Sequence, residues 1–398
     1  MSIFRDGEKH LSQVPALHLL QVMQPGWTLL SATQVERERR GKPSNVLLED
    51  ILASQLAKLN RIEQEGRQYP FSEGNIRTAI ERLRAPEPVG LMTLNERTTD
   101  LLQLGTSLDQ TIEGVTRGRS LQYIDWNEPS NNVFHVVAEL EVEKVASNET
   151  RRPDIVLFVN GIPLAVIKGK APEKDISEGV AQIITYQRAD EIPHLFRSVQ
   201  LVLAVNKNEA KYATVGTIAK FWSVWKEKEL TDGELTALIN APLSDQQKRA
   251  TFDGGFAEEQ APFEARREGG LTPTDQDQLI NSLCRPERLL DMARRYTLFD
   301  LGIKKVARYQ QFFAIRKIMR RVKSERDDNG ARRGGVVWHT QGSGKSLTMV
   351  MLAKALGLDR EIPNRRVVLV TDQIDLDKQL TRTFQACSTS SRATGPPS

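Results

Sequence analysis

Residues 154–170 decide the fold of this chain, and they read DIVLFVNGIPLAVIKGK. Two apolar runs in this stretch are separated by Asn160-Gly161, a residue pair that favours a tight turn between antiparallel strands. We therefore predict a hairpin with strands at residues 154–159 and 164–167. A polar residue begins the hairpin and a lysine-rich segment follows it, so the two ends can form a site.

The register of this hairpin decides whether its polar ends meet. A strict two-residue turn would place Asp154 opposite Ile167, and the polar residues would then be divided between the two faces. Asp154 faces Lys168 only if the loop has three residues, so that Val159 pairs with Pro163. A proline has no N–H to donate, and it is tolerated beside such a bulged loop.

The flanking sequence adds the other elements of a sheet. A strand at residues 133–142 precedes the hairpin, a helix at 176–190 follows it, and a buried strand at 199–205 closes the set. The order β-β-β-α-β indicates a mixed sheet with at least one helix packed on it. We assign residues 1–225 to this α/β domain. Upstream of the sheet we predict helices at residues 44–59 and 75–83 and strand-like stretches at 91–94 and 120–124.

A glycine-rich loop near the C-terminus predicts a nucleotide site. Apolar residues 336–338 precede the loop as the end of a strand, and residues 347–356 follow it with helical spacing. Such a loop directs backbone N–H groups and a helix N-terminus at phosphate oxygens. Lys345 would reach the β- and γ-phosphates, and the Ser346 hydroxyl would bind Mg²⁺. The candidate nucleotide-binding residues of the loop are Gly342, Ser343, Gly344, Lys345 and Ser346. The weaker alternative is a strand-to-helix turn with a chance lysine.

Composition restricts the class of protein. The chain has 398 residues, of which 39% are hydrophobic and 27% are charged, as in ordinary globular proteins. No apolar run approaches the roughly 18 residues that a membrane span needs, and the N-terminus lacks the apolar core of a signal peptide. The two cysteines, Cys284 and Cys387, argue against a disulfide framework or a zinc site. We therefore expect a cytoplasmic protein without a membrane partner.

The remaining segments complete the predicted organisation. Residues 226–290 read as a polar connector with short helices at 276–283 and 287–296. Residues 291–386 include a helix at 309–322, the nucleotide loop and a strand at 366–371. Residues 387–398 contain no large apolar side chain and are expected to be disordered. The segment from Arg294 to Arg326 contains eleven Lys/Arg and two Asp/Glu, and this local charge of +9 is typical of proteins that bind a phosphate backbone. A solvated helical face is the alternative explanation.

The polar ends of the hairpin resemble the PD-(D/E)xK nuclease signature, with Pro153-Asp154 followed by Lys168-Gly169-Lys170. In that signature two carboxylates hold Mg²⁺ against the scissile phosphate, and a lysine orients the attacking water. Here Lys168 stands where the second carboxylate belongs, and a lysine cannot bind a cation. Four other acids could supply the missing ligand, although loss of activity is the stronger expectation. They are Glu139 and Glu141 on the preceding strand and, less favourably, Glu173 and Asp175.

Together the two motifs resemble the restriction (motor and nuclease) subunit of type I restriction–modification enzymes. Four runs carry the resemblance: RPDIVLFVNG (152–161), ARYQQ (307–311), VWHTQGSGKS (337–346), and VTD (370–372) with DLD (375–377). The resemblance extends from the helix near residue 46 to about Phe384. It implies a PD-(D/E)xK nuclease-like mixed-sheet domain followed by the start of a RecA-like, superfamily 2 helicase domain.

The resemblance also implies roles for individual residues. Asp154 resembles the metal-binding aspartate of the family, and Lys170 resembles its catalytic lysine. Gln182 and Tyr186 match a Gln-x-x-x-Tyr pair implicated in nuclease function, although an i,i+4 pair on a helix can simply be packing. Gln310 resembles the glutamine that reads adenine in superfamily 2 motors, and an ordinary helix N-terminal glutamine is the alternative. Glu49 is a weak match to a further acid of the nuclease fold.

The activity that the resemblance implies is ATP-dependent translocation and Mg²⁺-dependent cleavage of unmodified duplex DNA, in a complex with modification and specificity subunits. We expect this chain to be impaired in both reactions. Lys168 replaces a carboxylate, and after Phe384 no acidic box and no second motor lobe follow, so the chain resembles a C-terminally truncated subunit. The alternative is a non-catalytic DNA-binding or assembly module. A repair helicase with a fused nuclease is disfavoured by the four runs.

Overall fold

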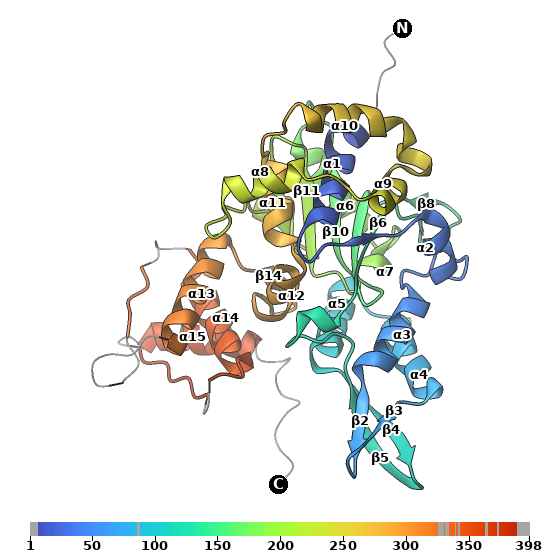
Figure 1. The fold of residues 1–398 in the computed structure, drawn as a ribbon. Helices are drawn as coiled ribbons and strands as arrows, with labels where there is room; N and C mark the ends of the chain where they lie inside the picture. The colour runs from blue at the N-terminus through green and yellow to red at the C-terminus, as the bar shows by residue number, and fades with distance from the viewer. Residues whose placement is uncertain are drawn as a thin grey trace. The chain divides into compact units, whose positions relative to one another are not determined.

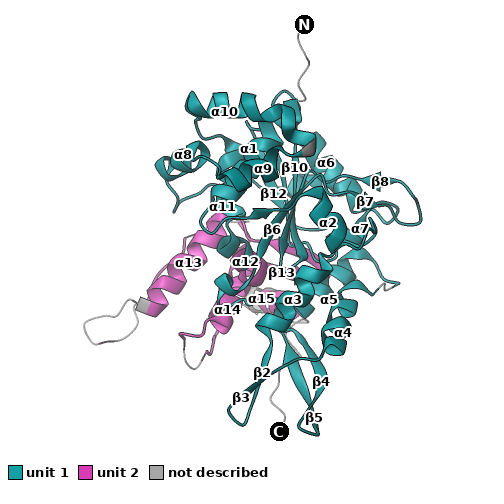
Figure 2. Ribbon diagram, turned by 45° about the vertical axis from the view of Figure 1, so that its right-hand side comes forward, with its two compact units in different colours: residues 1–290 teal, residues 291–398 magenta. Residues whose placement is uncertain are grey.

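The computed structural model describes residues 7–85, 88–324, 330, 334–338, 340, 343–362, 365–371 and 374–387. The chain divides into two compact units, residues 1–290 and 291–398 (Figure 2). Apart from Cys387, the tail predicted to be disordered lies outside the described residues. Among the helices of the described part, none combines the length and the apolarity needed to cross a lipid bilayer.

The first unit is built on a six-stranded sheet with the order β1-β6-β9-β10-β11-β12 (Figure 1). The pairs β1–β6 and β10–β11 are parallel and the other three are antiparallel, so the predicted mixed sheet is confirmed. The strands are β1 (Thr28–Leu29), β6 (Phe134–Ala138), β9 (Ile155–Val159), β10 (Ile162–Gly169), β11 (Leu201–Val205) and β12 (Ala210–Ala213). The edge strands β1 and β12 escape prediction because they are too short to carry a clear alternation.

The turn between β9 and β10 is shorter than the three-residue loop that would bring Asp154 opposite Lys168 in a regular hairpin. Val159 pairs with Ile162, so the turn has two residues and not three. Asn160 and Gly161 both have positive φ, 51° and 82°. Two-residue turns of this kind match the twist of the flanking strands, and Asn-Gly adopts them with little strain. The turn therefore does not meet the condition stated above for Asp154 to face Lys168.

A β-bulge in β10 restores the facing of the polar residues. The register shifts between Pro163 and Ala165, which leaves Leu164 as the extra residue. Beyond the bulge Ile167 pairs with Ile155. The next position along each strand consequently brings Asp154 and Lys168 opposite each other, as the nuclease signature requires.

Helix α6 (Ile176–Tyr186) covers the face of the sheet that carries these polar residues. Its buried side chains share an apolar cluster with alternate residues of the sheet: Ile176, Val180 and Ile183 with Val156, Val166 and Val202. Because successive side chains of a strand point to opposite faces, Asp154 lies on the same face as Val156, and Lys168 lies on the same face as Val166. The polar site is thus at the margin of the main core, beside α6.

Helices α1 (Val14–Val22) and α11 (Asp275–Leu283) pack on the opposite face. Phe134 of β6 contacts Trp27 edge to face, with ring centroids 5.5 Å apart. The Trp27 indole donates a 2.8 Å hydrogen bond to the carbonyl of Cys284, at the end of α11. Both faces of the central strands are therefore covered, which explains why β9 and β10 are buried along their whole length.

The other helices of the first unit confirm some predictions and correct others. They are α2 (Ala32–Glu38), α3 (Glu49–Leu59), α4 (Glu73–Arg84), α5 (Leu91–Leu104), α7 (Pro193–Phe196), α8 (Asp232–Asn240), α9 (Asp245–Phe252) and α10 (Gln260–Glu268), with short turns η1 (Lys9–Gln13), η2 (Pro129–Asn131), η3 (Ala219–Phe221) and η4 (Gly254–Glu259). Helix α12 (Pro286–Arg295) begins in the first unit and ends in the second. The strand predicted at 91–94 is wrong, because these residues begin α5. Its buried residues, Asn95, Thr98, Thr99 and Leu102, recur at helical spacing, but three of them are polar and hide the pattern.

Three short hairpins accompany the central sheet. They are β2 (Arg61–Gln64) with β3 (Arg67–Pro70), β4 (Thr106–Ile112) with β5 (Val115–Leu121), and β7 (Val142–Glu143) with β8 (Thr150–Arg151). The first two lie side by side at one end of the unit (Figure 1). Arg119 of β5 donates a 2.7 Å hydrogen bond to Gln64 of β2, which ties the two hairpins together.

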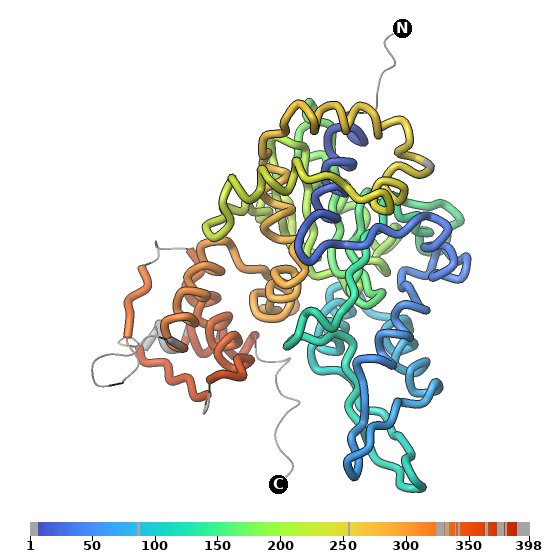
Figure 3. Tube along the Cα trace, viewed as in Figure 1, coloured from blue at the N-terminus to red at the C-terminus, as the bar shows by residue number. Residues whose placement is uncertain are grey.

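Residues 226–290, expected to be a connector, form helices that pack on α1 within the first unit. His10 is 2.6 Å from a carboxylate oxygen of Glu259, and Ser12 donates a 2.8 Å hydrogen bond to Gln276. The blue N-terminal trace consequently runs beside the yellow trace of these helices (Figure 3). The start of the chain is thus attached to segments about 250 residues later in the sequence.

The second unit contains helices α13 (Tyr309–Ser324), α14 (Lys345–Leu358) and α15 (Ile374–Cys387) and the hairpin β13 (Thr297–Asp300) with β14 (Ile303–Val306). Tyr296 and Phe312 contact each other in its core, with ring centroids 4.5 Å apart. The strands predicted at 336–338 and 366–371 are not formed in the described residues. Val336 and Val370 are 93% and 89% exposed. A strand of a parallel sheet needs hydrogen-bonded neighbours, and these two segments have none in the described residues.

Candidate functional site

Asp154 and Lys168 form a buried ion pair where the nuclease signature was predicted. One Asp154 carboxylate oxygen accepts a hydrogen bond from the Lys168 ammonium, and the other accepts a 2.7 Å bond from the backbone N–H of Gly169. Only 5% of the Asp154 side chain and 7% of the Lys168 side chain are exposed. The position of the expected second carboxylate is therefore occupied by a fixed positive charge.

A second carboxylate reaches the site from the N-terminus of the chain. One oxygen of Glu8 is 2.8 Å from the Lys168 ammonium, and the other is 3.7 Å from the Lys170 ammonium. Glu8 precedes η1, which passes over the end of β10. A Cβ atom at Gly169 would lie 2.6 Å from the hydroxyl of Ser12, so this approach depends on a glycine. Sequence reasoning missed Glu8, since no local pattern connects it to the hairpin.

Helix α6 forms the wall of the site and carries the predicted Gln-x-x-x-Tyr pair. The Gln182 amide donates a 2.7 Å hydrogen bond to the Tyr186 hydroxyl, as expected for residues one turn apart. A Cβ atom at Gly179 would lie 3.4 Å from Cγ of Lys170 and 3.8 Å from Cγ of Lys168. The glycine therefore lets α6 approach the stems of both lysines. Asp154 and Lys170 lie on the same side of the sheet, linked through Lys168 and Glu8.

Burial and charge together set the protonation of these groups. Burial raises the pKa of Asp154 to about 6, although the Lys168 ammonium opposes that rise. Burial acts to lower the pKa of Lys168, but the carboxylates of Asp154 and Glu8 outweigh it, and the pKa lies above its ordinary value. Burial also raises the pKa of the Tyr186 hydroxyl, and the Lys168 charge partly offsets this effect. At neutral pH Asp154 and Lys168 are consequently an ion pair.

The donor groups of this site do not fit Mg²⁺. Asp154 and Glu8 are the carboxylates that contact the two lysines, and each of them is bound to an ammonium group. In the part of the chain that the structure describes, no group of three or more His, Cys, Asp or Glu side chains could hold a metal ion. A divalent cation placed on Asp154 would also meet the Lys168 ammonium at short range. We therefore derive no chemical step through a metal here.

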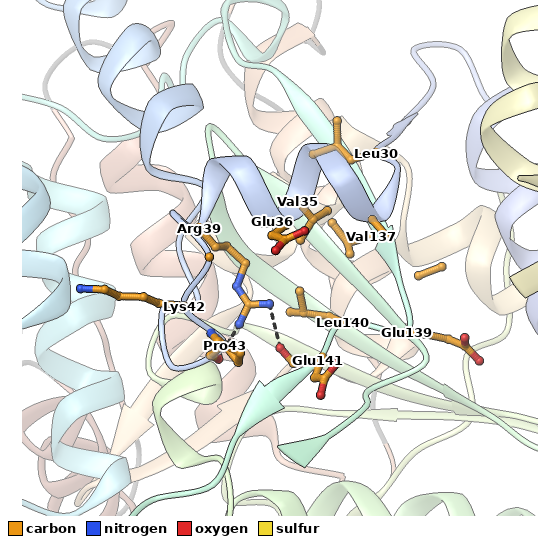
Figure 4. A pocket seen from close by; sticks show the side chains of 13 residues that line it. Leu30, Val35, Glu36, Arg39, Lys42, Pro43, Val137, Glu139, Leu140 and Glu141 are labelled. Atoms are coloured by element: carbon orange, nitrogen blue, oxygen red, sulfur yellow. Dashed lines mark hydrogen bonds between the residues drawn. The ribbon is translucent and has the colours of Figure 1, made fainter. Parts of the chain in front are cut away.

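The two acids expected to replace the missing ligand are held elsewhere. Glu139 forms an ion pair with Lys9 at 3.2 Å, and Glu141 forms one with Arg152 at 3.1 Å. Both line a pocket of about 340 Å³ between α2 and the segment after β6, and neither Asp154 nor Lys168 lines that pocket. Figure 4 shows the two carboxylates there, together with Arg39, which donates to the carbonyl of Glu141.

Of the three weaker candidates, two have other partners and one is exposed. The Asp175 carboxylate caps α6 by accepting a 2.7 Å hydrogen bond from the N–H of Ser177. Glu173 is exposed. Glu49 is buried at the start of α3, where its carboxylate lies 2.6 Å from Arg84 and 3.2 Å from Arg40. The Glu49 carboxylate therefore holds helices together in this unit.

The described part of the nucleotide loop forms the start of α14. Gly344 is left-handed, with φ of 84°, and precedes Lys345 and Ser346 in the first turn of this 14-residue helix. The preceding loop residue, Ser343, is partly buried, whereas Gly342 lies outside the described residues. A helix N-terminus with an exposed lysine has the charge and the donors that nucleotide phosphates require.

The glutamine that contacts this loop is Gln311 and not Gln310. The Gln311 amide donates 3.2 Å hydrogen bonds to the carbonyl of Gly344 and to the hydroxyl of Thr348. Gln310 is exposed on the first turn of α13, and its predicted contact with adenine stays a prediction. The two adjacent glutamines thus differ in exposure and contacts, and sequence reasoning missed the contacts of Gln311.

Comparisons with known proteins bear on this arrangement. The family model for the N terminus of type I restriction enzyme R proteins matches residues 7–220, and a model for the SWI2/SNF2 ATPase matches residues 310–395. The HindI type I restriction enzyme endonuclease subunit of Haemophilus influenzae is 29% identical over 355 residues, which cover 87% of this chain and 30% of that protein. A putative type I restriction enzyme endonuclease subunit of Methanocaldococcus jannaschii, MjaIXP, is 28% identical over 72% of this chain and 26% of its own length.

The chain thus spans less than a third of the length of these curated relatives. The first match covers the central sheet, α6 and the Asp154–Lys168 pair, and the second covers α13 and the nucleotide loop. The order of the two matches is the order of the two motifs in the sequence. Since the first match alone covers more than half of the chain, the chain belongs to the family of type I restriction enzyme R proteins.

Proposed function

We propose that this chain acts on unmodified duplex DNA as the motor and nuclease subunit of a type I restriction enzyme, with impaired cleavage. The observation that carries the proposal is the cluster of Asp154, Lys170, Gln182 and Tyr186 beside the end of β10. In a nuclease of the PD-(D/E)xK kind Lys170 would orient the water at the scissile phosphate, and the Gln182–Tyr186 pair would form the adjacent wall.

The impairment follows from Lys168. Its ammonium contacts both Asp154 and Glu8, and together with Lys170 it compensates the two carboxylates that would attract a divalent cation. Removal of a cation ligand together with addition of a positive charge opposes metal binding twice. The same observation favours the alternative function, a non-catalytic DNA-binding or assembly module of the restriction complex.

The second unit, in this proposal, binds ATP for translocation. Lys345 would contact the β- and γ-phosphates, Ser346 would hold Mg²⁺, and Gln310 would contact adenine. Gly342, Ser343 and Gly344 would supply the backbone N–H groups around the phosphates. The complex would also contain modification and specificity subunits, and it would work in the cytoplasm.

The test compares Mg²⁺ binding and DNA cleavage by the natural chain and by Lys168→Glu. Calorimetry should detect no Mg²⁺ binding to the natural chain at millimolar concentration, whereas Lys168→Glu places three carboxylates together and should bind it. Cleavage of unmodified linear DNA should appear only in Lys168→Glu. Lys58→Glu, the same substitution at an exposed lysine of α3, is the matched control. Equal Mg²⁺ affinity in the natural chain and in Lys168→Glu would contradict the proposed impairment.

A further inference from the structure

The carboxylate of Glu8 is shared between two lysines. Its two oxygens lie 2.8 Å from the Lys168 ammonium and 3.7 Å from the Lys170 ammonium. Lys168 and Lys170 are two residues apart and both lie beside α6, so their side chains extend in the same direction. A singly charged group with two oxygens is therefore held between two converging ammonium groups.

The positions of the two lysines do not depend on Glu8 alone. Lys168 also donates to Asp154, and the stems of both lysines pack near Gly179 of α6. The Lys170 backbone N–H donates a 2.8 Å hydrogen bond to the carbonyl of Val205. The lysine pair consequently belongs to the rigid sheet and helix, whereas Glu8 belongs to a different segment, which crosses over them.

The charges of the cluster balance only when Glu8 is in place. Asp154 and Glu8 contribute two negative charges, and Lys168 and Lys170 contribute two positive charges. If Glu8 leaves, the remaining three residues have a net positive charge at a partly buried position. A single phosphodiester has the same charge as a carboxylate, and it also presents two acceptor oxygens.

We propose that Lys168 and Lys170 form a binding site for a backbone phosphate of DNA that requires no divalent cation, and that Glu8 occupies this site as an internal competitor. The proposal rests on the proposed function only in that the chain meets DNA. Binding of DNA at this site moves the segment 7–13 away from the end of β10. In this chain the substitution at position 168 thus replaces a cation-mediated phosphate contact with a direct one.

Residues 9–13 have their own attachments, which define what must be released. Lys9 pairs with Glu139 at 3.2 Å, His10 lies 2.6 Å from Glu259, and Ser12 bonds to Gln276 at 2.8 Å. These contacts hold Glu8 near the lysines, so the effective concentration of the competing carboxylate is high. Binding to the natural chain is therefore weaker than binding to a chain without the Glu8 charge.

The experiment measures binding of a fluorescein-labelled 20-base-pair duplex to the full chain by anisotropy, with EDTA present throughout. Glu8→Gln should bind roughly tenfold more tightly than the natural chain, because one charged phosphate contact is no longer contested. The slope of log K against log salt should be the same in both chains, because DNA makes the same phosphate contact once Glu8 is displaced, and it should become shallower by about 0.9 when Lys170→Met removes that contact. Glu173→Gln, which removes an equal charge from an exposed acid near Gly7, controls for general electrostatics and should change neither quantity.

A double variant and an exchange measurement complete the test. The gain from Glu8→Gln should disappear in Glu8→Gln with Lys170→Met. In the natural chain, duplex DNA should increase amide hydrogen exchange at residues 9–13, and this readout does not depend on any variant folding. Equal affinity of Glu8→Gln and Glu173→Gln would overturn the proposal. The proposal would also be overturned if inorganic phosphate increased amide exchange at residues 9–13 and duplex DNA did not, because the site would then bind a small anion. Cleavage activity enters none of these readouts, so this inference and the proposed function can fail separately.

Discussion

Replacement of Lys168 by methionine should destabilise the first unit by about 3 kcal/mol at pH 7.5. The substitution keeps the length of the side chain and leaves Asp154, with 5% of its side chain exposed, without its ammonium partner. Removal of one member of a buried ion pair costs roughly 3–5 kcal/mol. The lower figure applies because burial raises the pKa of Asp154 and the Lys168 ammonium opposes that rise, so the pKa increases further when the ammonium is removed. Without the ammonium the buried carboxyl can take up a proton near neutral pH.

The pair can be isolated from other effects by a double-mutant cycle. Asp154→Asn should cost less, about 2 kcal/mol, because Lys168 keeps its 2.8 Å contact with Glu8. The double variant should lose about 3 kcal/mol of stability, whereas the two single variants together would lose about 5 kcal/mol. The difference is a coupling energy of about 2 kcal/mol. Lys58→Met, at an exposed lysine, should change stability by no more than about 0.5 kcal/mol.

The measurement is urea unfolding followed by tryptophan fluorescence. The first unit contains four of the five tryptophans, so the signal reports mainly on its unfolding. They are Trp27, Trp126, Trp222 and Trp225. Additivity of the two single variants within about 0.5 kcal/mol would refute the reasoning, because independent residues behave in that way.

Three further predictions concern other parts of the molecule. Burial lowers the pKa of His18 to about 4, so its contribution to stability should be complete above pH 6.5 and fall by about 3 kcal/mol as the pH is lowered from 6.5 to 4. A pH series of urea midpoints checks this. Because burial also lowers the pKa of His194 to about 4, His18→Gln should still lose stability over this range, but by about 3 kcal/mol less than the natural chain. Gly161→Ala should lower the free energy of unfolding by at least about 2 kcal/mol, because φ is 82° and the new Cβ would lie 2.5 Å from the carbonyl oxygen of Leu48. An unchanged melting temperature in a thermal scan would contradict this. Lys345→Ala should weaken nucleotide binding by roughly tenfold, measured with a fluorescent ATP analogue. ATP hydrolysis by the natural chain that increases when duplex DNA is added would contradict the expectation of an impaired motor.

Local patterns predicted the core of the candidate site. The apolar runs around Asn160-Gly161 are a feature of neighbouring residues, and the structure forms the hairpin there. Gln182 and Tyr186 are singled out by the family resemblance, and their hydrogen bond is one that an i,i+4 pair on a helix can make. Glu8 could not be predicted, because its contact with Lys168 joins residues 160 positions apart. Only the path of η1 over the sheet brings them together.

The errors have a similar origin. Helix α5 was hidden because its buried face includes Asn95, whose amide donates to the carbonyls of Phe196 and Val199 at 2.8 and 2.9 Å. Those acceptors come from the end of α7 and the segment after it, about a hundred residues later, so a polar residue is buried where a local pattern expects an apolar one. The strands expected at 336–338 and 366–371 require neighbouring strands, which the local apolar pattern of a segment does not supply.

The bulge at Leu164 has a consequence for how the signature is spaced in sequence. Sixteen positions separate Asp154 from Lys170, but one of them, Leu164, has no partner on β9 and adds no length to the ladder. A related chain without the bulge could keep Asp154 and the lysines on one face if its sequence between them were one residue shorter. With the same number of residues, both lysines would lie on the other face of the sheet. Single-residue insertions and deletions between the turn and Lys168 are therefore of two kinds. One kind is absorbed by the backbone and preserves the site, and the other inverts the strand and removes it.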